Sequence, residues 1–130
     1  MLFDASSLIY LLKLGSLELL KDNYIQWLTV YEATNALWKE ATLINSISLE
    51  EASNIVDVLC SVIDFMKMLS PHPYEREILT TASKLHMSVY DASYLVLANR
   101  NSLTLVTEDR ELKRKAQNIT RALSLKELIP

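Results

Sequence analysis

Glycine, cysteine and histidine are nearly absent from this sequence. Its 130 residues include one glycine, one cysteine and two histidines. A loop that cradles a phosphate needs several glycines, so a nucleotide-binding loop of that kind is excluded. Cys60 cannot form an internal disulfide, and its apolar neighbours predict a small buried hydrophobe in a reducing compartment. No cluster of soft metal ligands can be assembled from so few histidines and cysteines.

The two histidines do not form an acid–base pair. His72 lies between two prolines and His86 stands alone near the end of a predicted helix, so both are expected to be structural or solvent-facing. The sequence also lacks the Gly-x-Ser-x-Gly pattern of a serine hydrolase.

A basic surface and a long apolar run are missing as well. The net charge of -3 excludes a generally basic nucleic-acid coat, because non-specific binding to phosphates requires excess lysine and arginine. Residues 55–69 are apolar but contain Asp57, Asp64 and Lys67, which rules out a membrane helix there. An acid at position 4 with no basic region before it argues against a signal peptide, so we expect a cytoplasmic protein.

What is present is an alternation of short apolar strands and longer helical patterns. Strands are predicted near residues 1–4, 26–29, 66–69 and 103–109, and helices near residues 5–14, 30–41, 48–62, 73–85, 89–98 and 110–116. This order predicts an α/β fold in a single domain over residues 1–130, with a short, mainly parallel sheet flanked by helices. The helix at residues 89–98 is apolar nearly all round and should be buried.

Four acids fall at the ends of these strands or in the first turns of the helices: Asp4, Glu32, Asp91 and Asp109. Asp4 and Asp109 could simply cap the helices that follow them. Asp91 is harder to explain in that way, because an aspartate in an apolar helix is rarely buried without a partner. Several carboxylates in one partly dry place repel one another unless a cation neutralises them, and ligands made only of oxygen favour Mg²⁺ or Mn²⁺.

The segments around these acids carry a resemblance to a known family. LFDASSLI at residues 2–9, TVYEATNAL at 29–37, VYDASYLVLA at 89–98 and LVTEDREL at 105–112 resemble the four acidic motifs of PIN-domain ribonucleases, in the same order. The similarity extends over the whole chain and is greatest to the small VapC-type toxins of toxin–antitoxin pairs. It implies a PIN-like α/β/α sandwich.

The resemblance implies a role for each acid. Asp4 and Asp91 would hold the principal metal, Asp109 would complete its shell, and Glu32 would hold a second ion or orient the nucleophile. Ser6 and Thr107 would support these ligands through hydrogen bonds. The implied activity is metal-dependent endoribonuclease cleavage that leaves a 5′-phosphate and a 3′-hydroxyl.

Two kinds of partner are expected. The basic side chains that follow the acids are candidates for contacts to RNA phosphates, although they could equally form an ordinary solvated helix face. These candidates are Lys13, Lys39, Lys113, Arg114 and Lys115. Half of the residues are hydrophobic, which favours a homodimer and, by resemblance, a cognate antitoxin.

Two alternatives remain open from the sequence. The chain could be a PIN fold that has lost its activity and only binds a partner, although all four acids are present. It could also be a phosphate-accepting receiver domain, but Asp4 has no acidic neighbour and no lysine follows the strand near Thr107 as that family requires.

Overall fold

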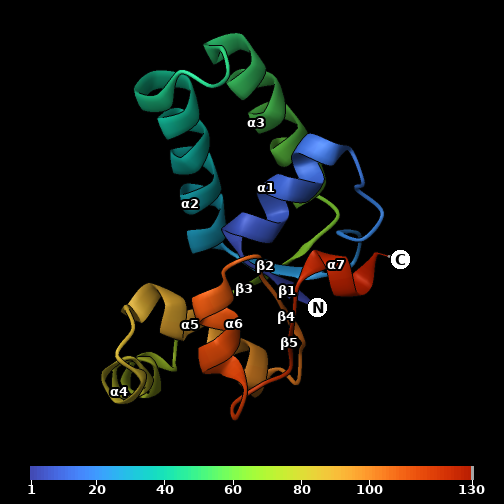
Figure 1. Cartoon of the computed structure of the whole chain (residues 1–130). Coiled ribbons are helices and arrows are strands. Elements are labelled where there is room, and N and C mark those ends of the chain that lie inside the picture. Colours follow the sequence, from blue (N-terminus) through green and yellow to red (C-terminus); the bar gives the residue numbers. More distant parts are fainter. Residues whose placement is uncertain (130) are drawn as a thin grey trace.

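The computed structural model describes residues 1–129 and is organised around a five-stranded parallel sheet (Figure 1). The strands are β1 (Leu2–Phe3), β2 (Tyr24–Gln26), β3 (Lys67–Leu69), β4 (Leu105–Val106) and β5 (Ala122–Leu123), in the spatial order β3-β2-β1-β4-β5. The chain builds outwards from β1 to β3 and then returns to the other side of β1. Binding sites in open α/β sheets form where the strand order reverses in this way, here between β1 and β4.

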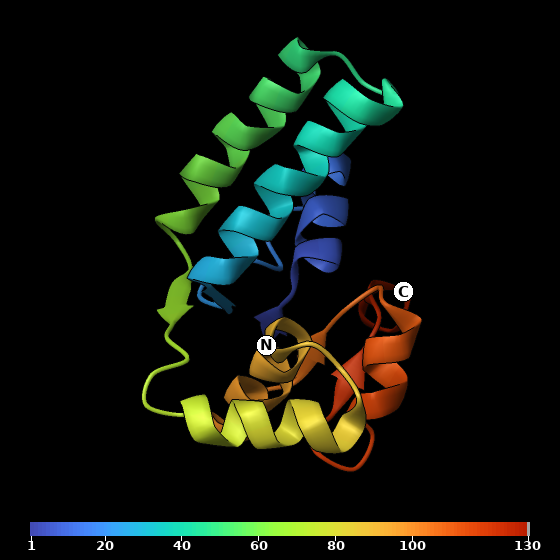
Figure 2. The ribbon, with the colours of Figure 1, turned by 90° about the vertical axis from the view of Figure 1, so that its left-hand side faces the viewer.

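Helices cover both faces of the sheet (Figures 1 and 2). They are α1 (Ala5–Leu14), α2 (Trp27–Trp38), the π-helix η1 (Lys39–Ile44), α3 (Leu49–Ile63), α4 (Glu75–Leu85), α5 (Val89–Arg100), α6 (Arg110–Ala116) and α7 (Leu125–Leu128). Helices α1, α2 and α3 lie on one face, and α4, α5 and α6 lie on the other. The predicted α/β/α sandwich is confirmed.

Strands β1 and β4 contribute side chains to the hydrophobic cores on both faces of the sheet. Leu2 pairs with Leu105 and Phe3 pairs with Val106 across β1 and β4, and all four side chains are fully buried. Leu2 and Leu105 pack with α5 and α6, whereas Phe3 and Val106 pack with α1 and α3. Successive side chains of a strand point to opposite faces, so two residues per strand suffice to join the layers.

Helix α5 is the buried helix that its composition predicts. Residues 92–98 are all buried, and the helix packs against the sheet on one side and α4 on the other. Only its first two residues, Val89 and Tyr90, expose large apolar surface. The start of α5 therefore presents an exposed apolar surface, whereas its exposed end carries the polar residues Asn99 and Arg100.

Two predicted helix ends are also found. Ser48 accepts a hydrogen bond from the Glu51 amide at the start of α3, as a capping box requires. Gly15 ends α1 with φ 78°, in the left-handed region that glycine adopts without strain, and its N–H donates to the Leu11 carbonyl.

Two predicted boundaries were wrong. Residues 26–29 are not a strand, because β2 ends at Gln26 and α2 begins at Trp27. Gln26 and Thr29 form a capping box in which the Gln26 amide donates to the Thr29 hydroxyl at 3.3 Å, and this capping outweighs the preference of Trp27 and Thr29 for a strand. Helix α4 starts at Glu75 rather than at Pro73, since a turn closed by the Tyr74 amide and the Pro71 carbonyl precedes it.

Cys60 is exposed, in contrast to the buried position predicted for it. The buried stripe of α3 consists of Ala52, Leu59 and Val62, and Cys60 is about 100° around the helix from Leu59. Over residues 1–129, none of the helices has the length and apolar character needed to cross a membrane.

We predict that Gly15→Ala lowers the free energy of unfolding by about 1 kcal/mol. A Cβ at Gly15 would meet no atom within 4 Å, so the loss reflects only the backbone conformation. Gly15→Asn should cost less, because asparagine tolerates this conformation better than alanine. Urea denaturation of the three proteins measures the difference, and an unchanged alanine variant would contradict a left-handed cap.

Candidate active site

Asp4 is a buried carboxylate at the carboxyl end of β1. Its side chain is only 5% exposed. One oxygen, Oδ1, caps α1 by accepting from the Ser7 amide at 3.0 Å, and it also accepts from the Ser6 hydroxyl at 2.8 Å. The other oxygen, Oδ2, accepts from the Thr107 hydroxyl. Asp4 therefore combines the capping that was one expectation with a position at the switch point of the sheet.

Ser6 and Thr107 hold the β4–α6 turn against this carboxylate. The amide of Glu108 donates to the Ser6 hydroxyl at 3.0 Å, and the amide of Asp109 donates to the Thr107 hydroxyl at 3.0 Å. Each hydroxyl thus accepts from the turn and donates to Asp4. Both residues lie where the family resemblance places ligand-supporting hydroxyls.

Asp109 and Asp91 occupy the first turns of two helices on the opposite face of the sheet (Figure 1). Asp109 is the cap of α6 and accepts from the amides of Glu111 and Leu112 at 2.9 and 3.1 Å. Asp91 is half-buried in the first turn of α5, and its own amide donates to the Ser88 hydroxyl. Acids are favoured at both positions because the N-terminal end of a helix carries partial positive charge.

Glu32 accepts a hydrogen bond from the buried side chain of Tyr94. Because α2 begins at Trp27, Glu32 lies in the second helical turn rather than the first turn predicted for it. The Tyr94 hydroxyl donates to Glu32 Oε1 at 2.6 Å and lies 2.8 Å from the Thr29 hydroxyl. Burial, followed by this hydrogen bond to Glu32, raises the pKa of Tyr94 far above its ordinary value, so the hydroxyl keeps its proton.

The four acids share one electrostatic environment. Burial is the largest cause that raises the pKa of Asp4, and its hydrogen bonds oppose it. Burial also raises the pKa of Glu32, with further contributions from Asp91 and Asp4. The pKa of Asp91 is raised by burial, then by Asp109 and Asp4, and Lys115 lowers it in part. Asp91 is thus coupled to each of the other three acids, and Asp4 is coupled to Glu32 and Asp91.

The donor set suits a hard divalent cation. All four groups are carboxylates, and these ions prefer oxygen ligands. Within residues 1–129, no three acidic, histidine or cysteine side chains converge closely enough to enclose an ion. Asp4 and Asp109 each point an oxygen at helix amides, and the acids of the group repel one another electrostatically. A cation would relieve that repulsion.

The basic side chains expected to contact RNA differ in their surroundings. Lys13 pairs with Glu40 at the far end of α1, Lys113 pairs with Glu127, and Arg114 pairs with Glu111. Lys39 is exposed in η1, seven residues beyond Glu32 and on the same side of the helical path. Lys115 is the candidate whose charge acts on the site, because its ammonium group lowers the pKa of Asp91. The same ammonium group donates a hydrogen bond to the His86 carbonyl at 2.8 Å.

Both histidines lie outside the acidic group. His72 pairs with Glu75 in the exposed turn before α4, and His86 ends α4 in a left-handed conformation. The expectation of structural or solvent-facing histidines is consistent with these positions.

Comparisons with known proteins agree with this architecture. The chain is 37% identical to "Exonuclease VapC9" of Pyrobaculum aerophilum, over 83% of this chain and 86% of that protein. It is 36% identical to "Ribonuclease VapC3" of the same organism, over 68% of this chain and 66% of that protein. The crystal structure of PAE2754 from Pyrobaculum aerophilum superposes with a TM-score of 0.81 and 34% identity, covering 98% of this chain and 90% of that one.

The chain belongs to the VapC family of PIN-domain proteins. A search of family models gives no match. The family assignment rests instead on whole-chain similarity and on the shared fold.

Sequence reasoning missed two polar residues that position the acids in this VapC protein. Tyr94 follows Asp91 by three residues and supports Glu32, and Thr29 supports Tyr94 in turn. A tyrosine in an otherwise apolar buried helix is a usable signal, because its hydroxyl needs a hydrogen-bond partner.

We predict that Asp91→Asn stabilises the metal-free protein. The folded-state pKa of Asp91 lies above its ordinary value of 3.8, so the wild type loses stability as pH rises above that value. Asparagine removes this penalty, but it also removes the favourable interaction of the charge with the first turn of α5. The gain in the free energy of unfolding at pH 7 is therefore limited to about 1 kcal/mol or less. Urea denaturation in EDTA from pH 3 to pH 8 should show the gain vanish at low pH.

Glu50→Gln is the matched control, because Glu50 is an exposed acid in the first turn of α3. It should give no stabilisation at any pH. An equal gain in both variants would contradict the repulsion among the site acids.

We predict that Tyr94→Phe lowers the free energy of unfolding by about 1–2 kcal/mol. Phenylalanine fills the same volume, but Thr29 and Glu32 each lose a hydrogen-bond partner. Combining the substitution with Glu32→Gln in a double-mutant cycle isolates the coupling between the two residues. Tyr10→Phe, at an exposed tyrosine, should change stability by no more than about 0.5 kcal/mol.

Proposed function

We propose that this VapC-family protein is a divalent-metal-dependent endoribonuclease and the toxin of a toxin–antitoxin pair. The observation that carries the proposal is the set of four carboxylates at the switch point of the sheet, where Asp4 helps to raise the pKa of both Glu32 and Asp91. The names of the relatives, an exonuclease and a ribonuclease, support a phosphodiesterase activity.

The acids would divide the work according to how they are held. Asp4 and Asp91 would bind the principal ion, because Asp4 is fixed by several hydrogen bonds and Asp91 carries none that would compete. Asp109 would complete that shell. Glu32, oriented by Tyr94, would hold a second ion or align the attacking water. Bound among these groups, Mg²⁺ or Mn²⁺ would supply a Lewis acid that activates water and offsets charge on the phosphate.

The reaction is the hydrolysis of an RNA backbone bond. Water adds to phosphorus, the bond between phosphorus and the 3′ oxygen breaks, and that oxygen takes up a proton. The products carry a 5′-phosphate and a 3′-hydroxyl.

Phosphate contacts would come from cations at the rim of the site. Lys39 is exposed on the Glu32 side, and the ion pairs of Lys113 and Arg114 are at the surface, where such pairs contribute little and can exchange for phosphate. Lys13, at the far end of α1, would contact a phosphate farther along the RNA. Lys115 would act mainly through Asp91 and the end of α4.

The partners would be a cognate antitoxin and a second copy of the chain. Large apolar side chains are exposed along α1, α2 and η1: Tyr10, Leu14, Trp38, Leu43 and Ile44. An apolar surface of this kind suits a protein partner better than solvent.

The decisive experiment is cleavage of mixed RNA with Mg²⁺, with Mn²⁺ and with EDTA, by the wild type and by Asp91→Asn. We expect cleavage only with metal, reduced on the order of 100-fold or more by the substitution. A circular RNA should also be cut, because an endonuclease needs no free end.

Asp57→Asn is the control, since Asp57 is an exposed acid on α3, away from the four carboxylates. It should cleave like the wild type. Cleavage by Asp91→Asn at the wild-type rate, or equal cleavage in EDTA, would contradict the assigned site. A wild type that binds RNA but never cleaves it would favour an inactive binding module.

A further inference from the structure

A largely apolar pocket opens at the same edge of the sheet as the carboxylates. Its volume is about 420 Å³, and its walls include Leu28 of α2, Ile78 of α4, and Val89 and Tyr90 of α5. Gln26, the last residue of β2, also lines it, which places the pocket at the carboxyl ends of the strands. We refer to this cavity as the Tyr90 pocket.

The Tyr90 pocket and the acidic site are built from the same two helices. Tyr90 directly precedes Asp91 in the first turn of α5. Leu28 precedes Glu32 by four residues in α2, so the two side chains are neighbours on one face of that helix. A polymer whose phosphate lies among the acids therefore has its next group within reach of this pocket.

The wall at Tyr90 is fixed rather than loose. The buried Gln26 side chain donates to the Ser93 hydroxyl at 2.9 Å, and that hydroxyl donates to the Tyr90 carbonyl at 2.6 Å. These bonds join the end of β2 to the start of α5. They hold the tyrosine backbone in place while its ring remains 59% exposed.

The lining selects a flat, weakly polar ligand. Its one charged residue is Glu75, which pairs with His72 through one carboxylate oxygen. An acid at this place disfavours a phosphate, and the other oxygen can accept from a donor such as the amino group of a base. An exposed aromatic ring beside apolar side chains is the usual platform on which a nucleic-acid base stacks.

We propose that the Tyr90 pocket receives an unpaired base of RNA next to the phosphodiester bond at the acidic site, with Tyr90 as the stacking residue. The assignment rests on the proposed ribonuclease function and adds to it a base-binding pocket and the residue that stacks on the base. A base within a duplex is already stacked and paired, so it cannot enter.

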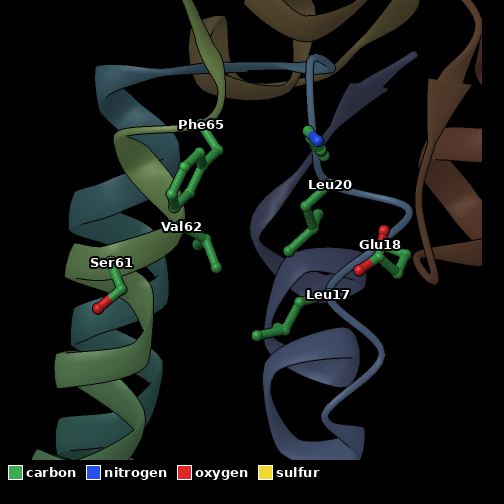
Figure 3. A pocket seen from close by; sticks show the side chains of 7 residues that line it. Leu17, Glu18, Leu20, Ser61, Val62 and Phe65 are labelled. Atoms are coloured by element: carbon green, nitrogen blue, oxygen red, sulfur yellow. The ribbon is translucent and has the colours of Figure 1, made fainter.

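A second pocket of this protein provides an internal control. It has a volume of about 330 Å³ and lies between the loop after α1 and the end of α3, with Leu17, Leu20, Val62 and Phe65 in its lining (Figure 3). These segments lead into β2 and β3, so this pocket lies at the amino-terminal ends of the strands, whereas the acids lie at the carboxyl ends. Phe65 is 62% exposed and matches Tyr90 in exposure.

The test measures the binding of a fluorescent single-stranded RNA of about ten nucleotides, and of its duplex, by fluorescence anisotropy. Ca²⁺ is used as the divalent ion, and a denaturing gel verifies that the RNA stays intact. We expect Tyr90→Ala to weaken single-strand binding about 5- to 100-fold and to leave duplex binding unchanged. Tyr90→Phe should bind like the wild type because it retains the ring, and Phe65→Ala should also bind like the wild type.

Three results would overturn the proposal. They are unchanged single-strand binding by Tyr90→Ala, an equal loss with Phe65→Ala, and a loss that sedimentation traces to dissociation of a dimer, which would assign the pocket to a second copy of the chain. Because binding is measured without cleavage, the outcome is separate from that of the nuclease assay. Ring-dependent binding by an inactive wild type would support the pocket and reject the nuclease.

Discussion

The carboxylate of Asp4 is the group on which the rest of the site depends. It is buried, and it accepts hydrogen bonds from Ser6 and Ser7 at one end of the chain and from Thr107 at the other. A buried carboxylate without such donors would cost several kcal/mol, so these contacts are required once β1 and β4 lie side by side. The same hydroxyls accept from the Glu108 and Asp109 amides, and the bonds that satisfy Asp4 also fix the position of the next acid.

This arrangement sets stability against function. Burial raises the pKa of Asp4, and burial together with repulsion from neighbouring acids raises the pKa values of Glu32 and Asp91. The folded protein therefore holds these acids at a cost in free energy. Helix N-termini and hydroxyl donors reduce that cost but do not remove it. Acids held at a cost to folding would gain from binding a cation, in keeping with the proposed metal-dependent phosphodiesterase.

The surroundings of the acids would divide recognition of the proposed RNA substrate between two kinds of contact. Cations such as Lys39 would meet phosphates, and the ring of Tyr90 would meet a base. The chain is acidic overall, so a broad electrostatic attraction to RNA is weak. Stacking in the Tyr90 pocket would supply affinity that charge does not, and it would favour RNA whose bases are unpaired.

The sequence by itself determined the α/β class, the burial of α5, the ends of α1 and α3, and the four acids as one candidate site, because these follow from local periodicity, capping and short motifs. It misplaced the start of α2, where a reciprocal cap competed with strand propensity. Only the tertiary structure decided that Tyr94 supports Glu32, that Lys115 acts on Asp91 and that the Tyr90 pocket adjoins the acids. Each of these contacts joins segments that local pattern does not relate, and the packing of helices on a reversed strand order creates them.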